Sequence, residues 1–121
     1  MPSVEVRMEN PRVRVSHVVF EPGVPREGYV RPTAQVVVFL DDCRYQRVDA
    51  ETGAKLMRER RAGETLWHEA GEQAPVLINA GSASASEIVA GALQDRGLPP
   101  RAWLFGIARN LVNTHRRKWF R

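Results

Sequence analysis

Residues 22–42 read PGVPREGYVRPTAQVVVFLDD, and this stretch decides the fold that the sequence predicts. A segment rich in Pro and Gly leads into the apolar, β-branched run 35–40, and two aspartates follow it. Such a run is typical of a buried strand, and an Asp pair is typical of a turn. Many β-barrels hold a ligand or a metal ion at the barrel mouth with a loop and strand of this kind. Three polar side chains stand here, and none is a strong metal ligand: Tyr29, Arg31 and Gln35.

The rest of the chain up to residue 94 alternates between strand-like runs and turns. Residues 13–20, for example, alternate apolar and polar side chains, which is the period of a strand with one buried face. Residues 55–60 also fit a helical turn, but their place directly after a turn favours a strand. Short strands separated by turns predict an all-β sandwich or barrel. The expected strands are 4–8, 13–20, 35–40, 43–48, 55–60, 65–68, 75–79 and 85–93.

Length and composition restrict the class of protein. With 121 residues, 43% of them hydrophobic, the chain is long enough for one compact domain with a core. No apolar run approaches about 20 residues, so we expect no membrane span, and the N-terminus does not resemble a signal peptide. The single cysteine, Cys43, cannot form an intrachain disulfide. We interpret it as a half-buried residue at a strand end rather than a reactive thiol, and we expect a cytoplasmic protein.

The positive charge is concentrated in the C-terminal tail. Residues 1–94 hold 11 Lys and Arg against 13 Asp and Glu, whereas residues 95–121 hold seven against one. The net charges of these two parts are therefore −2 and +6. We divide the chain accordingly into a barrel over residues 1–94 and a Pro-containing linker with a basic helix over residues 95–121.

Apolar residues in the tail recur at intervals of three and four, which predicts an amphipathic helix of about 15 to 20 residues after residue 100. They are Leu104, Ile107, Ala108, Leu111 and Val112. The apolar stripe fits packing on the barrel or across a dimer interface. A second interpretation is that the basic end is an arm that contacts nucleic acid or another protein. A third is that the tail has no function of its own.

Three features in a fixed order resemble the single-domain, RmlC-like cupins. They are Pro22-Gly23 ahead of an apolar strand, the turn 62–64 leading to Trp67, and Gly71 leading to the strand 75–79. The resemblance covers roughly residues 10–93. It implies a cupin-type double-stranded β-helix, which is a small jelly-roll barrel with a ligand pocket between its sheets. It also favours a homodimer, because barrels of this family often pair through an edge strand.

The resemblance also identifies the positions at which metal-binding cupins place their ligands. Such cupins carry a His-x-His pair, a Glu and a third His before an Asn, and Asn79 lies within one residue of that Asn position. Arginine brings a fixed positive charge that repels a metal ion, so we expect no metal and no cofactor. The alternative is an improvised metal site that uses His17 or His68. The four ligand positions are all substituted: Tyr29, Arg31, Gln35 and Ala74.

A pocket with these side chains favours an anion. Arg31 suits a carboxylate or phosphate, Tyr29 and Gln35 suit hydrogen bonds, and Trp67 suits an aromatic wall. Strand alternation places His68 on the face opposite Trp67. The alternatives are a vestigial pocket and a Trp67 that belongs to the core.

A second, shorter resemblance concerns the tail. The segment PPRAWLFGIARNLVNTHRRKW is similar to a segment of extracytoplasmic-function sigma factors. It covers about 20 residues, and the other helices of that domain are absent, so polymerase binding and promoter recognition are not implied. The matching residues are Trp103, Leu104, Ile107, Ala108, Asn110, Arg116 and Arg117.

These observations favour a metal-independent protein that binds a small anionic ligand, whose identity the sequence does not give. One alternative is an enzyme, isomerase-like or dioxygenase-like, with an improvised site that uses His17 or His68. Another is a regulatory module that contacts a partner or nucleic acid through the basic helix. No Ser-His-Asp arrangement, phosphate loop or carboxylate pair is apparent, so we assign no catalytic residue.

Overall fold

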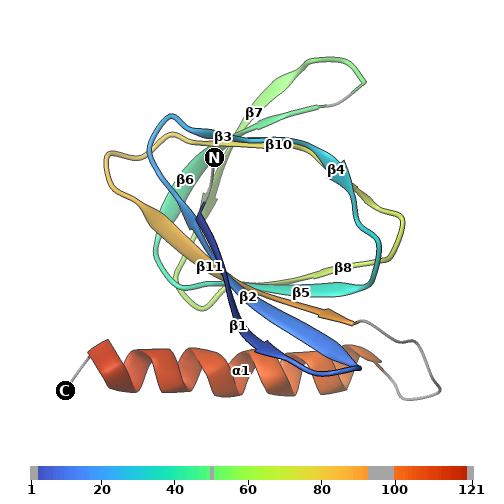
Figure 1. Cartoon of the computed structure of the whole chain (residues 1–121). Coiled ribbons are helices and arrows are strands. Elements are labelled where there is room, and N and C mark those ends of the chain that lie inside the picture. The colour runs from blue at the N-terminus through green and yellow to red at the C-terminus, as the bar shows by residue number, and fades with distance from the viewer. Residues whose placement is uncertain (1–2, 50, 93–99, 120–121) are drawn as a thin grey trace.

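The computed structural model describes residues 3–49, 51–92 and 100–119, which form eleven strands followed by one helix (Figure 1). The strands are β1 (Ser3–Glu9), β2 (Val13–Phe20), β3 (Pro25–Arg26), β4 (Tyr29–Val30), β5 (Gln35–Phe39), β6 (Cys43–Val48), β7 (Lys55–Arg60), β8 (Thr65–His68), β9 (Gln73–Ala74), β10 (Val76–Asn79) and β11 (Ala85–Ala92). The helix is α1 (Pro100–Trp119).

Two antiparallel sheets face each other across the interior of the barrel (Figure 1). One has the strand order β1-β2-β11-β5-β8, and the other has the order β3-β10-β6-β7. A short two-stranded sheet, β4-β9, adds to the wall. Neighbouring strands in these sheets are often far apart in sequence, as β2 and β11 are, which is typical of a jelly roll. The all-β barrel with a C-terminal helix is therefore confirmed.

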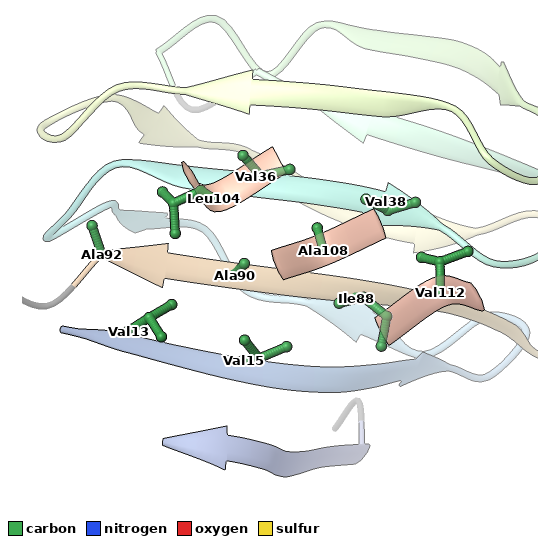
Figure 2. Packing of buried hydrophobic residues seen from close by; sticks show 10 residues of the cluster. All are labelled: Val13, Val15, Val36, Val38, Ile88, Ala90, Ala92, Leu104, Ala108 and Val112. Carbon is green, nitrogen blue, oxygen red and sulfur yellow. The ribbon is translucent and has the colours of Figure 1, made fainter. Parts of the chain in front are cut away.

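The helix α1 lies across the outer face of the five-stranded sheet, against β11 and β5 (Figure 1). Leu104, Ala108 and Val112 point from the helix toward this sheet and are buried there (Figure 2). Of the alternatives for the apolar stripe, the structure thus shows packing on the barrel. This helix is not of the length and apolarity that crossing a membrane would require. Seven sheet residues complete the cluster: Val13, Val15, Val36, Val38, Ile88, Ala90 and Ala92.

The structure differs from the expected strands at three places. The two-residue strands β3, β4 and β9 lie in segments that we expected to be irregular. Pairs this short leave no periodic pattern in the sequence, and their partners lie far along the chain, as Tyr29 and Ala74 do in β4 and β9. The expected strand end at residue 93, the boundary at 94/95 and the linker 95–99 lie outside the described residues.

Candidate ligand-binding site

The interior of the barrel contains a cavity of about 70 Å³ between the two sheets. Strand alternation sends Val37 and Phe39 of β5 into this interior, while Val36 and Val38 point to the helix. A cavity of this volume can hold a few water molecules or a small anion. Its polar lining contains four arginines and one carboxylate: Arg26, Arg31, Arg47, Arg60 and Glu87, with Tyr29, Tyr45 and His68 beside them.

Arg31 is the most deeply buried of the cavity residues that the sequence singled out, with 5% of its surface exposed. Its Nη1 atom donates hydrogen bonds to Oε1 of Gln35 at 2.7 Å and to Oη of Tyr29 at 3.2 Å. Its buried Nε atom has no hydrogen-bond partner. A buried N–H donor without a partner costs free energy, so the position suits a ligand that accepts a hydrogen bond.

The backbone of Arg31 is fixed by the loop after β8. The amide of Arg31 donates to the carbonyl of Glu72 at 3.0 Å, and the amide of Gly71 donates to the carbonyl of Arg31 at 2.7 Å. Gly71 has a φ of 83°, in the left-handed region that glycine adopts without steric cost. Gly71, in the loop after β8, therefore helps to hold the guanidinium of Arg31 in place.

A second guanidinium, Arg26 of β3, shares the Tyr29 ring with Arg31. The two guanidinium carbons lie 5.5 Å and 5.6 Å from the centroid of that ring, so each makes a cation–π contact. Nη2 of Arg26 donates to the carbonyl of Pro75 at 2.6 Å, and its buried Nε has no partner. Burial lowers the pKa of Arg26. Two incompletely bonded cations thus line the cavity.

Glu87 lies in the same interior, on the strand β11, and is 5% exposed. Its carboxylate takes part in no hydrogen bond or ion pair among the described residues. Burial raises the pKa of Glu87 to about 7, although the positive charges of Arg26 and Arg31 act in the opposite direction. Glu87 is therefore a carboxyl group that can change its charge near neutral pH.

His68 of β8 also lines the cavity. Its Nδ1 atom lies 3.0 Å from Oε1 of Glu72. Because an ionised carboxylate only accepts hydrogen bonds, Nδ1 is the donor and Nε2 is left as the acceptor of the neutral ring. Burial is the largest influence on the pKa of His68, which is lowered from its ordinary value of 6.5.

Tyr29 and Arg31 line the cavity, and Gln35 accepts a hydrogen bond from Arg31 without being one of the lining residues. Trp67 lies elsewhere. The Trp67 ring stacks on Phe105 of α1 with a centroid distance of 6.4 Å, and it packs against the core cluster. Trp67 does not line the cavity, and its neighbour His68 does. Trp67 and His68 lie on opposite faces of β8, as alternation predicts, and Trp67 follows the alternative in which it belongs to the core. His17 is likewise not among the cavity residues.

At the four positions where the resemblance to cupins would place metal ligands, the side chains do not fit a metal ion. Arg31 and Gln35 are hydrogen-bonded to each other, Tyr29 bonds to the same guanidinium, and Ala74 has no donor atom. Transition metals require imidazole, carboxylate or thiolate ligands, and a guanidinium repels them. Among residues 3–49, 51–92 and 100–119, no group of three or more His, Cys, Asp or Glu side chains could hold a metal ion.

Sequence reasoning missed Glu87 and Arg26. The signal for Glu87 was present, because β11 reads ASEIVAGA and Glu87 is its only charged residue. Period-two alternation groups Glu87 with Ala85 and Val89, on the face opposite Ile88 and Ala90. Only the helix on that second face reveals that the face with Glu87 is the interior of the barrel.

A larger depression, about 990 Å³, lies at the other end of β5 from Arg31. It is wide and open, and it is lined by loop residues such as Asp42, Gly81 and Ser82. Cys43 borders it, and burial raises the pKa of this thiol to about 11, so the thiol is not activated. The smaller interior cavity is the better candidate site, because it collects buried polar groups without partners.

The family model that matches this sequence is that of peptidase family S41, over residues 28–106. The match spans more than half of the chain. By sequence, the chain belongs to peptidase family S41. We expected the cupins instead, and the family match does not support that expectation. The matched residues nevertheless form strands β4 to β11 and the start of α1, within the antiparallel barrel described above.

Solved structures that resemble this chain have the cupin fold. A cupin domain from Bordetella pertussis Tohama I superimposes with a TM-score of 0.67 and 18% identity, over 75% of this chain and 92% of that one. The polyketide cyclase RemF from Streptomyces resistomycificus gives a TM-score of 0.62 and 11% identity, over 77% and 66%. An oxalate oxidase in complex with the substrate analogue glycolate gives a TM-score of 0.51 and 20% identity, over 68% of this chain and 43% of that one. These likenesses establish the double-stranded β-helix fold alone, since proteins of this fold differ in function.

No curated protein matches this sequence.

Proposed function

We propose that the barrel binds a small anionic ligand in its interior cavity, without a resident metal ion. The observation that carries this proposal is the buried guanidinium of Arg31, whose Nη1 is fixed by Gln35 and Tyr29 while its Nε has no partner. Arg26 supplies a second unpartnered Nε in the same cavity. Buried donors on cations are strong hydrogen-bond sites for carboxylates and oxyanions.

The size of the cavity limits the ligand. About 70 Å³ suits an anion with a handful of non-hydrogen atoms, such as a short carboxylate or an inorganic oxyanion. A sugar phosphate would require the barrel to open. The diverse functions of the fold neighbours give no narrower class of ligand.

Thermal unfolding tests the proposal. The melting temperature of the wild-type protein is measured with increasing acetate, oxalate and sulfate, and with chloride at matched ionic strength, because salts such as sulfate stabilise proteins generally. A ligand that binds only the folded state raises the melting temperature with concentration. Arg31→Gln should lose this shift, and Arg12→Gln, at an exposed arginine, should keep it. Equal shifts in both variants, or none in the wild type, would refute the proposal.

A second candidate function is acid–base catalysis on the same ligand. His68 lines the cavity, and Glu72 fixes its tautomer, which is an arrangement that general bases use. We do not extend peptidase activity to this chain. In the described part of residues 28–106, no hydrogen bond joins a Ser, Thr or Cys side chain to His68 or Lys55, the pairing that a nucleophile needs.

Three further expectations stay predictions from the sequence: a homodimer, a cytoplasmic location and a regulatory role for the basic end of the helix. The side chains of residues 114–119, which include most of the basic groups of α1, lie outside those that the structure describes.

A further inference from the structure

The arrangement of charges inside the barrel suggests more than simple anion binding. Arg26 and Arg31 have buried Nε donors without partners, and Glu87 lines the same cavity without a hydrogen bond or ion pair among the described residues. A bound anion therefore meets arginines that attract it, two of them with an unpartnered donor, and one carboxylate that repels it. At the short distances and low polarity of such an interior, this repulsion is strong.

We propose that the cavity binds a small anion together with one proton, which Glu87 takes up. The proposal rests on the proposed function, because it concerns the same cavity. Protonation converts Glu87 from a negative charge into a neutral hydrogen-bond donor. The ligand then enters a site without the negative charge of Glu87 and meets the unpartnered Nε donors of both arginines. The proton comes from the solvent, and no covalent bond forms or breaks.

The groups around Glu87 identify it as the one that titrates. The residues that line this cavity from β5 and β10 are apolar, and arginine side chains in general are protonated at neutral pH. His68 has a pKa below 6.5, so it is neutral above about pH 7. The Cys43 thiol, with a pKa of about 11, stays protonated. The charged and titratable residues that line these cavities with Glu87 are Arg26, Tyr29, Arg31, Cys43, Arg44, Tyr45, Arg47, Arg60 and His68.

Burial already raises the pKa of the free Glu87 carboxyl to about 7. A nearby anion disfavours the ionised form further, so the pKa in the complex lies higher still. By thermodynamic linkage, a ligand that raises a pKa binds more weakly as the pH rises between the two values. The dissociation constant should therefore increase roughly tenfold from about pH 7 to about pH 8.5.

Isothermal titration calorimetry tests this coupling with acetate, oxalate and sulfate, whose own charges are constant above about pH 7. Each titration is repeated in two buffers with different ionisation enthalpies, which gives the number of protons taken up. We expect uptake of close to one proton at about pH 8.5 in the wild type and none in Glu87→Gln. Glu87→Gln should also bind with similar affinity at both pH values.

The other outcomes overturn the proposal in distinguishable ways. Binding without proton uptake would refute the coupling and leave anion binding intact. No binding of any probe at either pH would refute the proposed function as well. Uptake that persists in Glu87→Gln, or that disappears in His68→Gln, would assign the proton to another group. Glu51→Gln, at an exposed turn carboxylate, serves as the matched control and should behave as the wild type.

Discussion

Nη1 of Arg31 lies 2.7 Å from Oε1 of Gln35, inside a β-barrel of the cupin fold. The same Nη1 atom also donates to Oη of Tyr29, so two side chains hold one buried guanidinium. A buried cation of this kind is complemented by an anion.

Substitutions at Arg31 and Tyr29 should show how much of the ligand affinity comes from the cation and how much from the side chain that positions it. Arg31→Lys keeps the charge but loses the planar fork, so the affinity for acetate should fall by more than about tenfold. Tyr29→Phe removes one hydrogen bond, worth about 1 kcal/mol, so the affinity should fall about fivefold. Titration calorimetry at about pH 7 measures both. A larger loss in Tyr29→Phe than in Arg31→Lys would place the binding site elsewhere.

The titration of Glu87 should be visible in the stability of the free protein. The pKa of this carboxyl is about 7 in the folded protein, against an ordinary value of 4.5. The folded state therefore holds the proton more tightly than the unfolded state. Its contribution to stability is full below about pH 4.5 and is lost as the pH rises to about 7. At about 1.4 kcal/mol for each pKa unit, the loss is of the order of 3 kcal/mol.

Glu87→Gln removes this titration. We expect the variant to exceed the wild type by about 3 kcal/mol in free energy of unfolding above about pH 7, and to match it near pH 4. His68, whose pKa is lowered, destabilises the fold as the pH falls below 6.5, but it does so in both proteins. Urea unfolding across this pH range measures the difference. A difference that does not change with pH would mean that Glu87 is charged throughout or neutral throughout.

The sequence allowed the barrel to be predicted because its strands are long enough to show alternation. Strand-like runs such as 35–40 predicted an all-β sandwich or barrel, and the resemblance to cupins, carried partly by the turn glycines at 63 and 71, implied the cupin type. Both glycines have the positive φ of tight turns. The helix was predicted for a similar reason, because its apolar residues repeat at helical spacing over several turns.

The site was predictable only in part. Arg31 bonds to both Tyr29 and Gln35, because one local segment and one strand start bring them together, and their role in binding stays a prediction. Which face of β8 turns inward depends on α1, since the helix covers the face that holds Trp67. Alternation along a strand gives two faces but does not say which one meets a distant element. Glu87 was missed for the same reason.

Asn79 connects three parts of the chain near the end of β10. Its Nδ2 donates to the carbonyls of Phe20 and Ala83 at 2.9 Å and 3.0 Å, and its Oδ1 accepts from the amide of Gly81 at 2.9 Å. The residue is 5% exposed. Asn79→Ala leaves these backbone groups unpaired, and we expect a loss of about 2 to 4 kcal/mol in urea unfolding.

Asn79→Asp provides a sharper comparison, because it has nearly the same shape. It loses the donor and turns a carboxylate toward two carbonyl oxygens, so it should be at least as destabilising as alanine at about pH 7. The loss should shrink as the pH falls and the carboxyl group becomes a donor. An aspartate variant with wild-type stability at neutral pH would show that these hydrogen bonds contribute little.

The contact between α1 and the barrel should contribute strongly to stability through Leu104. This side chain is fully buried and lies in the cluster with Val36 and Ala108 (Figure 2). Leu104→Ala removes buried methyl groups and leaves a cavity, so it should cost about 3 kcal/mol. Leu56→Ala is the matched control, since Leu56 on β7 is 51% exposed and its truncation should cost less than about 1 kcal/mol. Urea unfolding of the two variants measures both losses. If the losses were equal, the helix would contribute little to the stability of the barrel, and its apolar stripe would be free to serve another partner.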